Sequence, residues 1–494
     1  MTSADAFGIL LKLITFSEPQ WPKRSSVLSH PSNPADSSAR SPKSPEEQRP
    51  TKRILIDMSH AHNARLNTGI QRVIRKIAEH LPEVVEQDSV SCETVVFRDG
   101  YFQSTQSQTG WIALDFRAYR QQFSERLPSA YRRAIGWLVP QRSPFKKLHD
   151  FLLPPQNRLG IFYLPVKLFF AIAAAVRRST RSWRRVRIDQ HDLLLLADGY
   201  WVVPHIWSGV TDARRHGAHI AVIVYDLITL QHPHFFVDGA LRKFQNYIGQ
   251  VETHAQQVIA ISQTVEEELR KLWKDRPSAP TLTHFPLGAD IASPSVITCR
   301  HEVAAVFDAP HRPVYLIVAT IEPRKNHEMV LDAFDLIWPH NDARLLVAGR
   351  LGWKCQSIVD RICSHARYGQ SLFLITDLSD SELAHAYSES AGVICPSLAE
   401  GFGLPIVEAL WYGKATFASD IPIHREVGRV DVQYFDANDA PALARLIDLH
   451  SQEIQANGST LKLESNSCRP LTTWHDSAQA LWSRLKLSAS KHPH

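Results

Sequence analysis

A glycine-rich turn between an apolar run and a short helix, within Pro396–Glu426, constrains the fold of this chain more than any other feature. The apolar residues Ala391–Cys395 suit a strand buried on both faces of a parallel sheet. The turn Gly401–Pro405 follows, and its glycines can adopt backbone angles that are closed to other residues. The pattern then predicts a helix over Ile406–Tyr412, which opens after a proline and ends at Gly413.

Two glutamates, Glu400 and Glu408, flank this turn. The start of the helix offers free N–H groups and a positive dipole end, so the turn suits an anion such as a phosphate. We expect Glu408 in the first turn of the helix, with both carboxylates facing one ligand. Two glutamates alone would more often be a solvated pair beside an ordinary strand-to-helix turn, and it is the surrounding string that favours a ligand site.

Apolar strands that alternate with helices run through most of the chain and predict an α/β protein with doubly wound parallel sheets. The expected organisation is an N-terminal domain over 51–291, a linker over 292–311, a C-terminal domain over 312–472 and a last helix over 473–494 that crosses back to the first domain. Residues 1–50 are rich in Ser, Pro and charge and are expected to form a disordered tail.

Residues 103–189 form a variable basic insertion without a recognisable motif. Within it, the apolar run Phe162–Val176 is followed by a series of arginines. The run is too short to span a bilayer, but segment 162–187 fits a helix that lies on an anionic membrane surface. A buried helix with a solvated basic tail is the alternative.

Composition limits the functional classes. The chain has 494 residues, 44% of them hydrophobic, and a net charge of only +5, so we expect a globular protein that does not bind nucleic acid. Its six cysteines contain no Cys-x-x-Cys pair, which argues against a structural zinc site or a disulfide framework and for a reducing compartment. The first residues lack the pattern of a secretory signal. We expect a cytoplasmic protein.

Further polar residues follow the predicted strands. Arg324 and Lys325 come after the strand Pro313–Val318 and suit a diphosphate, because arginine grips two oxygens and lysine adds a point charge. Asp226 comes directly after the strand Ala218–Val224 and Tyr225, at an edge where such sheets bind ligands. Exposed pairs of basic residues are commonly only solvated. The nearby motif with Glu400 and Glu408 favours a phosphate-binding role for Arg324 and Lys325.

The string Glu-Gly-Phe-Gly-Leu-Pro-x-x-Glu from Glu400, followed by Ser-Asp-Ile-Pro from Ser419, resembles the Glu-x7-Glu signature of retaining glycosyltransferases of family GT4, the group 1 glycosyltransferases. The resemblance covers about residues 53–100 and 190–488. It implies the GT-B fold, two Rossmann-like domains that face each other across a cleft. It also implies that Glu400 lies at the donor sugar and that Glu408 holds the ribose hydroxyls of the nucleotide.

The same resemblance implies roles for further residues of this chain. The Glu-Pro-Arg-Lys-Asn string places Arg324 and Lys325 at the leaving diphosphate, and the Tyr-Asp-Leu-Ile string makes Asp226 a catalytic residue beside the transferred sugar. Many relatives have histidine where this chain has Tyr225. The remaining assignments are donor contacts at Gly69, Gly349, Gly401, Phe402, Gly403 and Leu404, and acceptor or cleft contacts at Gln71, Arg72 and Tyr225.

The implied function is transfer of a sugar with retention of configuration, without a metal or other cofactor, because no Asp-x-Asp loop stands at a suitable place. The Thr-Gly-Ile-Gln-Arg and Glu-Pro-Arg-Lys-Asn variants resemble mannosyl- and rhamnosyltransferases of bacterial surface polysaccharide synthesis. This favours GDP-mannose as donor and a glycan or lipid-linked glycan as acceptor, at the inner face of the cytoplasmic membrane. A sugar-nucleotide epimerase of the same fold and a non-catalytic partner in polysaccharide assembly remain as alternatives.

Overall fold

The computed structural model describes residues 51–62, 69–105, 184–290, 299–309, 312–457 and 471–489. The predicted tail, most of the basic insertion and residues 162–183 of the predicted membrane segment lie outside these ranges. No helix among the described residues is long and apolar enough to cross a membrane.

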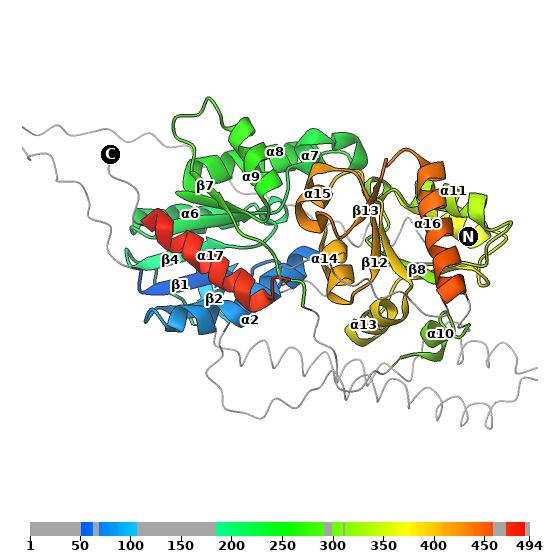
Figure 1. Cartoon of the computed structure of the whole chain (residues 1–494). Helices are drawn as coiled ribbons and strands as arrows, with labels where there is room; N and C mark the ends of the chain where they lie inside the picture. The colour runs from blue at the N-terminus through cyan, green and yellow to red at the C-terminus, as the bar shows by residue number, and fades with distance from the viewer. Residues whose placement is uncertain are drawn as a thin grey trace, which may run out of the picture. The chain divides into compact units, whose positions relative to one another are not determined.

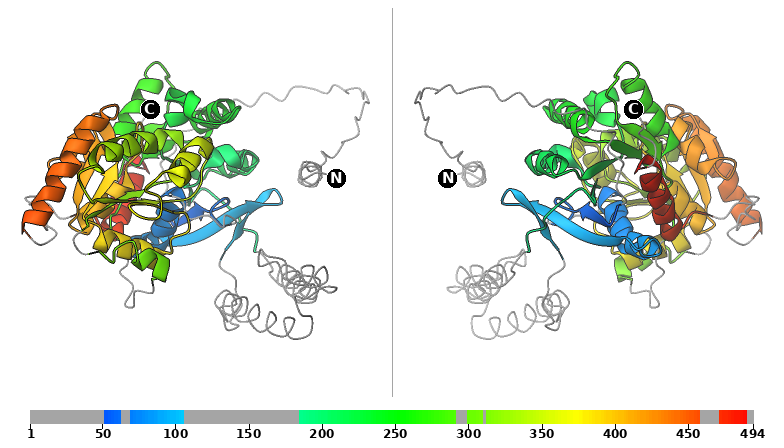
Figure 2. Two further views of the ribbon diagram at one scale, coloured as in Figure 1. Left: turned by 90° about the vertical axis from the view of Figure 1, so that its right-hand side faces the viewer. Right: turned by 90° about the vertical axis from the view of Figure 1, so that its left-hand side faces the viewer.

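The N-terminal domain is built on a seven-stranded sheet with the order β3-β2-β1-β4-β5-β6-β7. Every pair of neighbouring strands is parallel except β2 and β3, which form an antiparallel hairpin at one edge (Figure 2). The strands are β1 (Arg53–Asp57), β2 (Ser91–Arg98), β3 (Tyr101–Ser104), β4 (Asp192–Leu196), β5 (His219–Val224), β6 (Gln257–Ala260) and β7 (Thr281–His284).

Helices cover both faces of this sheet, because successive side chains of a strand point to opposite faces. In β1, Ile54 and Ile56 join an apolar cluster with α2 and α17, whereas Leu55 joins a second cluster on the other face. All three are 0% exposed. The helices of this domain include α2 (Gly69–Glu86), α6 (Ile206–Arg215), α7 (Ile228–Gln231), α8 (Ala240–His254) and α9 (Gln263–Leu272).

The C-terminal domain contains a six-stranded, fully parallel sheet with the order β10-β9-β8-β11-β12-β13. The strands are β8 (Val314–Val318), β9 (Arg344–Ala348), β10 (Leu372–Ile375), β11 (Gly392–Cys395), β12 (Ala415–Ser419) and β13 (Gln433–Phe435). The helices are α10 (His301–Ala304), α11 (His327–Ile337), α12 (Gln356–Ser364), α13 (Asp380–Glu389), α14 (Leu404–Trp411), α15 (Pro422–Gly428) and α16 (Ala440–Asn457). The predicted α/β fold with two Rossmann-like sheets is confirmed.

Helix α17 (Trp474–Ala489) follows the C-terminal domain in the chain but packs on α2 of the N-terminal domain (Figure 1). The indole of Trp482 donates a hydrogen bond of 2.5 Å to Asp88, just beyond the end of α2. The hydroxyl of Ser477 donates to the carbonyl of Pro286, at 2.8 Å. Helix α17 thus completes the apolar core of the first domain.

Helix α2 contains Pro82 and continues to Glu86, because Leu81, Val84 and Val85 are buried and their packing outweighs the backbone hydrogen bond that the proline removes. In the C-terminal sheet, Tyr434 and Phe435 belong to β13, which completes the sheet edge beside β12.

Helix α14 starts at Leu404, so Glu408 is its fifth residue and does not lie in its first turn. The physical reason is Gly403, whose positive φ of 93° lets the helix begin directly after the turn. Part of the predicted linker also belongs to the C-terminal domain, since Val306 packs in its core and Arg300 binds Glu382 of α13.

Candidate active site

The predicted site residues gather where the C-terminal sheet changes direction. Strand β8 lies between β9 and β11, so the chain leaves β8 to one side and returns to its other side at β11. Ligands of such sheets bind at the carboxyl ends of the strands at this point. The loop after β8 carries Arg324 and Lys325, and the loop after β11 carries Ser397 and Glu400.

Glu400 is held by two cations and a hydroxyl. Lys325 Nζ forms an ion pair with its Oε1 atom, and Arg324 Nη1 lies 3.0 Å from Oε2. The hydroxyl of Ser397 donates to Oε1 at 2.7 Å. Burial opposes ionisation of this carboxyl, which is 11% exposed, but the charges of Lys325 and Arg324 outweigh it and hold the pKa of Glu400 below its ordinary value. The site therefore contains a fixed carboxylate.

Arg324 is oriented from a second side by Glu322. Its Nε atom lies 2.6 Å from Oε1 of Glu322, whose side chain is 1% exposed, and its Nη1 atom donates to the carbonyl of Ala399. Burial opposes the charge of this guanidinium, but Glu400 and Glu322 raise its pKa above the ordinary value. His327 lies behind the pair, and burial together with the charge of Lys325 lowers its pKa to about 3. His327 is therefore neutral and adds no positive charge.

Glu408 has partners from two domains. Arg72 of α2 donates from Nη1 to its Oε1 atom, and the hydroxyl of Tyr387 on α13 donates to Oε2 at 2.6 Å. The carboxyl is 3% exposed, and burial raises its pKa against the opposing charge of Arg72. The two glutamates of the motif thus have separate sets of partners, and Glu408 is more deeply buried than the sequence suggested.

The glycine turn fits closely against the N-terminal domain. A Cβ atom on Gly401 would lie 2.1 Å from the carbonyl oxygen of Tyr225, a distance that no side chain tolerates. The hydroxyl of Ser262 donates to the carbonyl of Gly401 at 2.9 Å. Ser262 also caps α9, since its hydroxyl accepts from the backbone N–H of Val265. Glycine at 401 is thus required for the approach of the two domains.

Asp226 of the N-terminal domain lies at the same place. A Cβ atom on Gly401 would be 3.1 Å from Cβ of Asp226. One carboxylate oxygen of Asp226 accepts from the backbone N–H of Ile228 at 3.1 Å. Burial raises the pKa of Asp226, while the neighbouring charges of Arg324 and Lys325 lower it. Asp226 therefore lies beside the charged group of Arg324, Lys325 and Glu400, which belongs to the other domain.

Three other predicted residues, Gly69, Gly349 and Phe402, pack against neighbouring segments. Gly69 opens α2, and a Cβ atom there would lie 3.7 Å from Leu404, which itself packs on the core of the N-terminal domain. Gly349 follows β9 and lies against the backbone of Ala319. Phe402 is 7% exposed and is part of the same N-terminal core, so its side chain serves the contact between domains.

Tyr225 and Gln71 were predicted to contact the acceptor or line the cleft, and the structure places both in the protein interior. Tyr225 is 4% exposed and its hydroxyl donates to the carbonyl of Ala197 at 2.6 Å, because its side chain points into the core behind β5. Gln71 is 2% exposed on the buried face of α2. Neither side chain is available to an acceptor in this conformation.

Several contacts between the domains had no signal in the sequence. The carboxylate of Glu426 on α15 accepts from the backbone of Gln263 and Thr264, at the first turn of α9. On another loop, Trp353 stacks on Phe236 with ring centroids 5.4 Å apart and donates to the carbonyl of Phe235. Each of these contacts joins segments that are far apart in the sequence, so no local sequence pattern predicts it.

The N-terminal sheet has its own group of acids at its change of direction. Asp57 ends β1 and is 0% exposed, and it accepts from Tyr200 at 3.0 Å and from the hydroxyl of Ser59 at 2.6 Å. Burial raises the pKa of Asp57 to about 7. Asp198, which follows β4, accepts from the backbone of His60 at 2.9 Å and lies 3.4 Å from its ring.

Comparisons with known proteins agree with this arrangement. Residues 304–455 match the family model described as glycosyl transferases group 1. The chain is 26% identical over 318 residues to the serotype-specific mannosyltransferase WbdA of Escherichia coli, and the match covers 62% of this chain and 38% of that protein. It is 24% identical over 243 residues to the O-antigen chain mannosyltransferase B of Escherichia coli, covering 49% of this chain and 63% of that protein.

Among solved structures, this chain resembles the sucrose-phosphate synthase of Thermosynechococcus elongatus with a TM-score of 0.52 and 16% identity. That match covers 89% of this chain and 100% of the other and shows the fold alone. The chain spans less than half the length of the WbdA protein that it matches.

Proposed function

We propose that this chain, which has the GT-B fold and matches the group 1 glycosyl transferases over residues 304–455, transfers a sugar from a nucleotide-diphosphate donor to a hydroxyl of a glycan or lipid-linked glycan. The observation that carries the proposal is the charged group of Arg324, Lys325 and Glu400, at the sheet edge where ligands of this fold class bind. Asp226 of the other domain lies beside this group.

The chemistry needs positive charge where the diphosphate leaves. Arg324 and Lys325 supply two fixed cations, and the buried partner Glu322 keeps the guanidinium in place before any ligand arrives. Charges that are oriented in advance stabilise a developing negative charge without reorganisation during the reaction. We therefore assign the leaving-group role to these side chains and propose that the reaction proceeds without a metal ion.

Glu400 is the residue we assign to the donor sugar. Its pKa is held below the ordinary value, so it is a carboxylate at neutral pH and can stabilise positive charge at the sugar carbon where the bond breaks. Asp226 approaches from the acceptor domain and would orient the sugar hydroxyls. We propose retention of configuration on the strength of the Glu-x7-Glu pattern and assign the ribose hydroxyls to Glu408.

The relatives' names suggest the sugar. Two of them are called mannosyltransferases, one of the O-antigen chain, so we propose GDP-mannose as donor and a growing surface polysaccharide as acceptor. The transfer reaction would then take place in the cytoplasm, at the inner face of the membrane, where a lipid-linked acceptor would be exposed.

The proposal is tested with the purified full chain. Melting temperatures in the presence of GDP, UDP and ADP sugars identify the donor, since a ligand that binds only the folded state raises them. Labelled GDP-mannose is then incubated with and without a mannose-terminated glycan, and the anomeric configuration of the product is read by NMR. We expect an acceptor-dependent, α-configured product from wild type and almost none from Lys325→Met.

Two other results would overturn the proposal. Conversion of the labelled sugar nucleotide without an acceptor would identify an epimerase. No binding of any sugar nucleotide, together with normal polysaccharide synthesis in cells that carry Lys325→Met, would identify a non-catalytic partner. The exposed-lysine variant Lys271→Met controls for loss of charge alone.

A further inference from the structure

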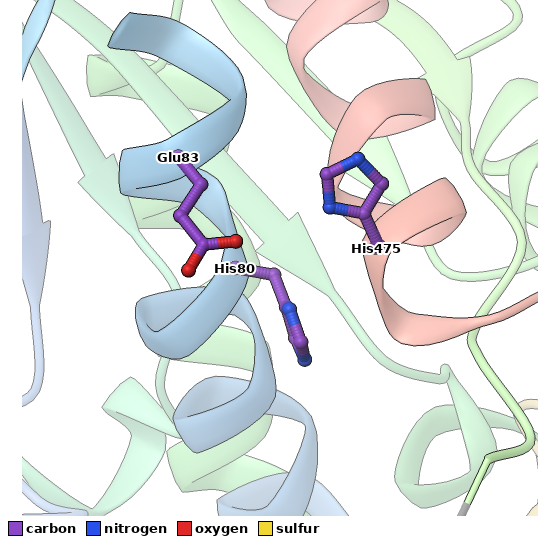
Figure 3. A group of neighbouring side chains, drawn as sticks. All are labelled: His80, Glu83 and His475. Atoms are coloured by element: carbon purple, nitrogen blue, oxygen red, sulfur yellow. The ribbon is translucent and has the colours of Figure 1, made fainter.

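Two histidines and a glutamate lie together between α2 and α17. His80 and Glu83 belong to α2, and His475 is the second residue of α17. Figure 3 shows His475 reaching from α17 towards α2, and the side chain of Glu83 turned along α2 towards His80. One nitrogen or oxygen atom from each residue lies within 4.8 Å of those of the other two. None of the three has a role in the site described above.

The backbones that carry these residues are held in place. His80 and Glu83 are three positions apart on a helix, so they share one face. Next to His475, Trp474 is 3% exposed and its N–H donates to Asp290 at 2.5 Å. Donor groups on rigid elements hold a ligand more tightly than groups on loops, because less ordering is needed when the ligand binds.

The polar atoms of the group are not fully satisfied by the protein. The Nε2 atom of His80 is buried and has no hydrogen-bond partner among the described residues. The rings of His80 and His475 meet edge to face with centroids 6.4 Å apart. Within the described part of the chain, Glu83 forms no ion pair.

We propose that His80, Glu83 and His475 bind a divalent transition-metal ion, with Zn²⁺ as the representative species. Two imidazoles and one carboxylate form a donor set that Zn²⁺ accepts, whereas Mg²⁺ prefers a shell of oxygen atoms. Zinc bonds of ~2.0–2.2 Å place neighbouring donors ~3.4 Å apart in a tetrahedron. The donor atoms of the three residues lie within 4.8 Å of one another, so they exceed this spacing by no more than ~1.4 Å, a difference on the scale of small side-chain rotations.

The ion would act as a structural link. Helix α17 follows the C-terminal domain in the chain and packs on the N-terminal domain. An ion bound by both His475 and α2 would therefore stabilise the packing of α17 on the N-terminal domain. His80 lies eight residues beyond Arg72, or about 12 Å along the helix axis. The site is therefore separate from the Arg72–Glu408 pair, and the proposal is independent of the roles assigned to the donor-binding residues.

The experiment uses untagged full-length chain that a chelator has stripped of metal. Calorimetric titration with Zn²⁺ in excess Mg²⁺ is expected to show one ion bound per chain. The substitutions His475→Gln, His80→Gln and Glu83→Gln should each weaken Zn²⁺ binding by about 10-fold or more. Zn²⁺ should raise the melting temperature of wild type and slow amide exchange at the start of α17, and Mg²⁺ should do neither.

The control is His216→Gln, because His216 is exposed at the end of α6, away from this group, and its loss should leave Zn²⁺ binding unchanged. Glu83→Gln alters an exposed side chain and keeps the test open if a histidine variant fails to fold. Equal Zn²⁺ binding by wild type and all three variants would show adventitious binding at other histidines and overturn the proposal. Absence of any Zn²⁺-dependent rise in melting temperature would do the same.

Discussion

Arg72 and Glu408, separated by 336 positions, form an ion pair that joins the two domains beside the glycine turn. The side chain of Arg72 is 25% exposed and that of Glu408 only 4%, so the pair is largely buried between the domains. The hydroxyl of Tyr387 donates to the second oxygen of Glu408. The carboxylate that we assign to the donor ribose is therefore already bound by a cation, and a donor has to share it with Arg72 or displace Arg72.

Glu408→Gln removes the charge and leaves Arg72 without its partner. We expect it to lower the unfolding free energy by about 2–3 kcal/mol, somewhat less than a fully buried pair would cost, because Arg72 is partly exposed. The double variant Arg72→Met/Glu408→Gln should recover part of this loss in chemical denaturation. Tyr387→Phe is the matched control for a hydrogen bond without charge. Additive single and double effects would show that the pair is not coupled.

Lys325→Met tests the cation assigned to the leaving diphosphate. Because the lysine contacts Glu400 and would stabilise charge that develops in the reaction, we expect kcat to fall by about 100- to 1000-fold with a smaller change in KM. Steady-state kinetics with the donor identified above provide the measurement. A change confined to KM would assign Lys325 to ground-state binding instead.

Asp57 gives the protein a defined pH dependence. Its folded pKa of about 7 lies above the ordinary value of 3.8, so between these values the unfolded chain releases a proton that the folded chain keeps. Its contribution to stability is complete below pH 3.8, falls as pH rises and is lost above about pH 7.

Between pH 5 and 7 this contribution should fall by about 2–3 kcal/mol. We expect the melting temperature of wild type, relative to Asp57→Asn, to decrease across this range, which a thermal melt at each pH measures. A constant difference from pH 5 to pH 8 would show that Asp57 is ionised throughout.

Gly401→Ala tests the close approach of the two domains. The added methyl group would meet the backbone of Tyr225, which cannot rotate away, so we expect a loss of about 2–4 kcal/mol in stability and weaker donor binding. Gly249→Ala is the control, because Gly249 lies in α8 with no atom near its Cβ position. That change should stabilise the helix by about 0.5–1 kcal/mol. A neutral Gly401→Ala would mean that the domains are not held in this contact.

Local sequence patterns predicted the strands well, since period and apolar runs depend on near neighbours. The strands predicted over Ala218–Val224 and Pro313–Val318 are observed as β5 and β8, and each starts one residue later than predicted. The length of α2 has a different cause, because the burial of Val84 and Val85 against the N-terminal core decides that the helix passes Pro82.

For the site, the sequence determined the chemical groups: the cations and acids of Glu322–Asn326, the glutamates that flank the turn, and Asp226 at a strand end. Each of these groups belongs to a short motif that adjacent residues are enough to identify. The tertiary structure alone decided that Arg72 binds Glu408, that Tyr225 and Gln71 point inward, that Glu426 caps α9, and that His475 meets His80. These pairings join segments that are far apart in the chain, and they depend on how the two sheets and the last helix pack, a property that no single stretch of residues encodes.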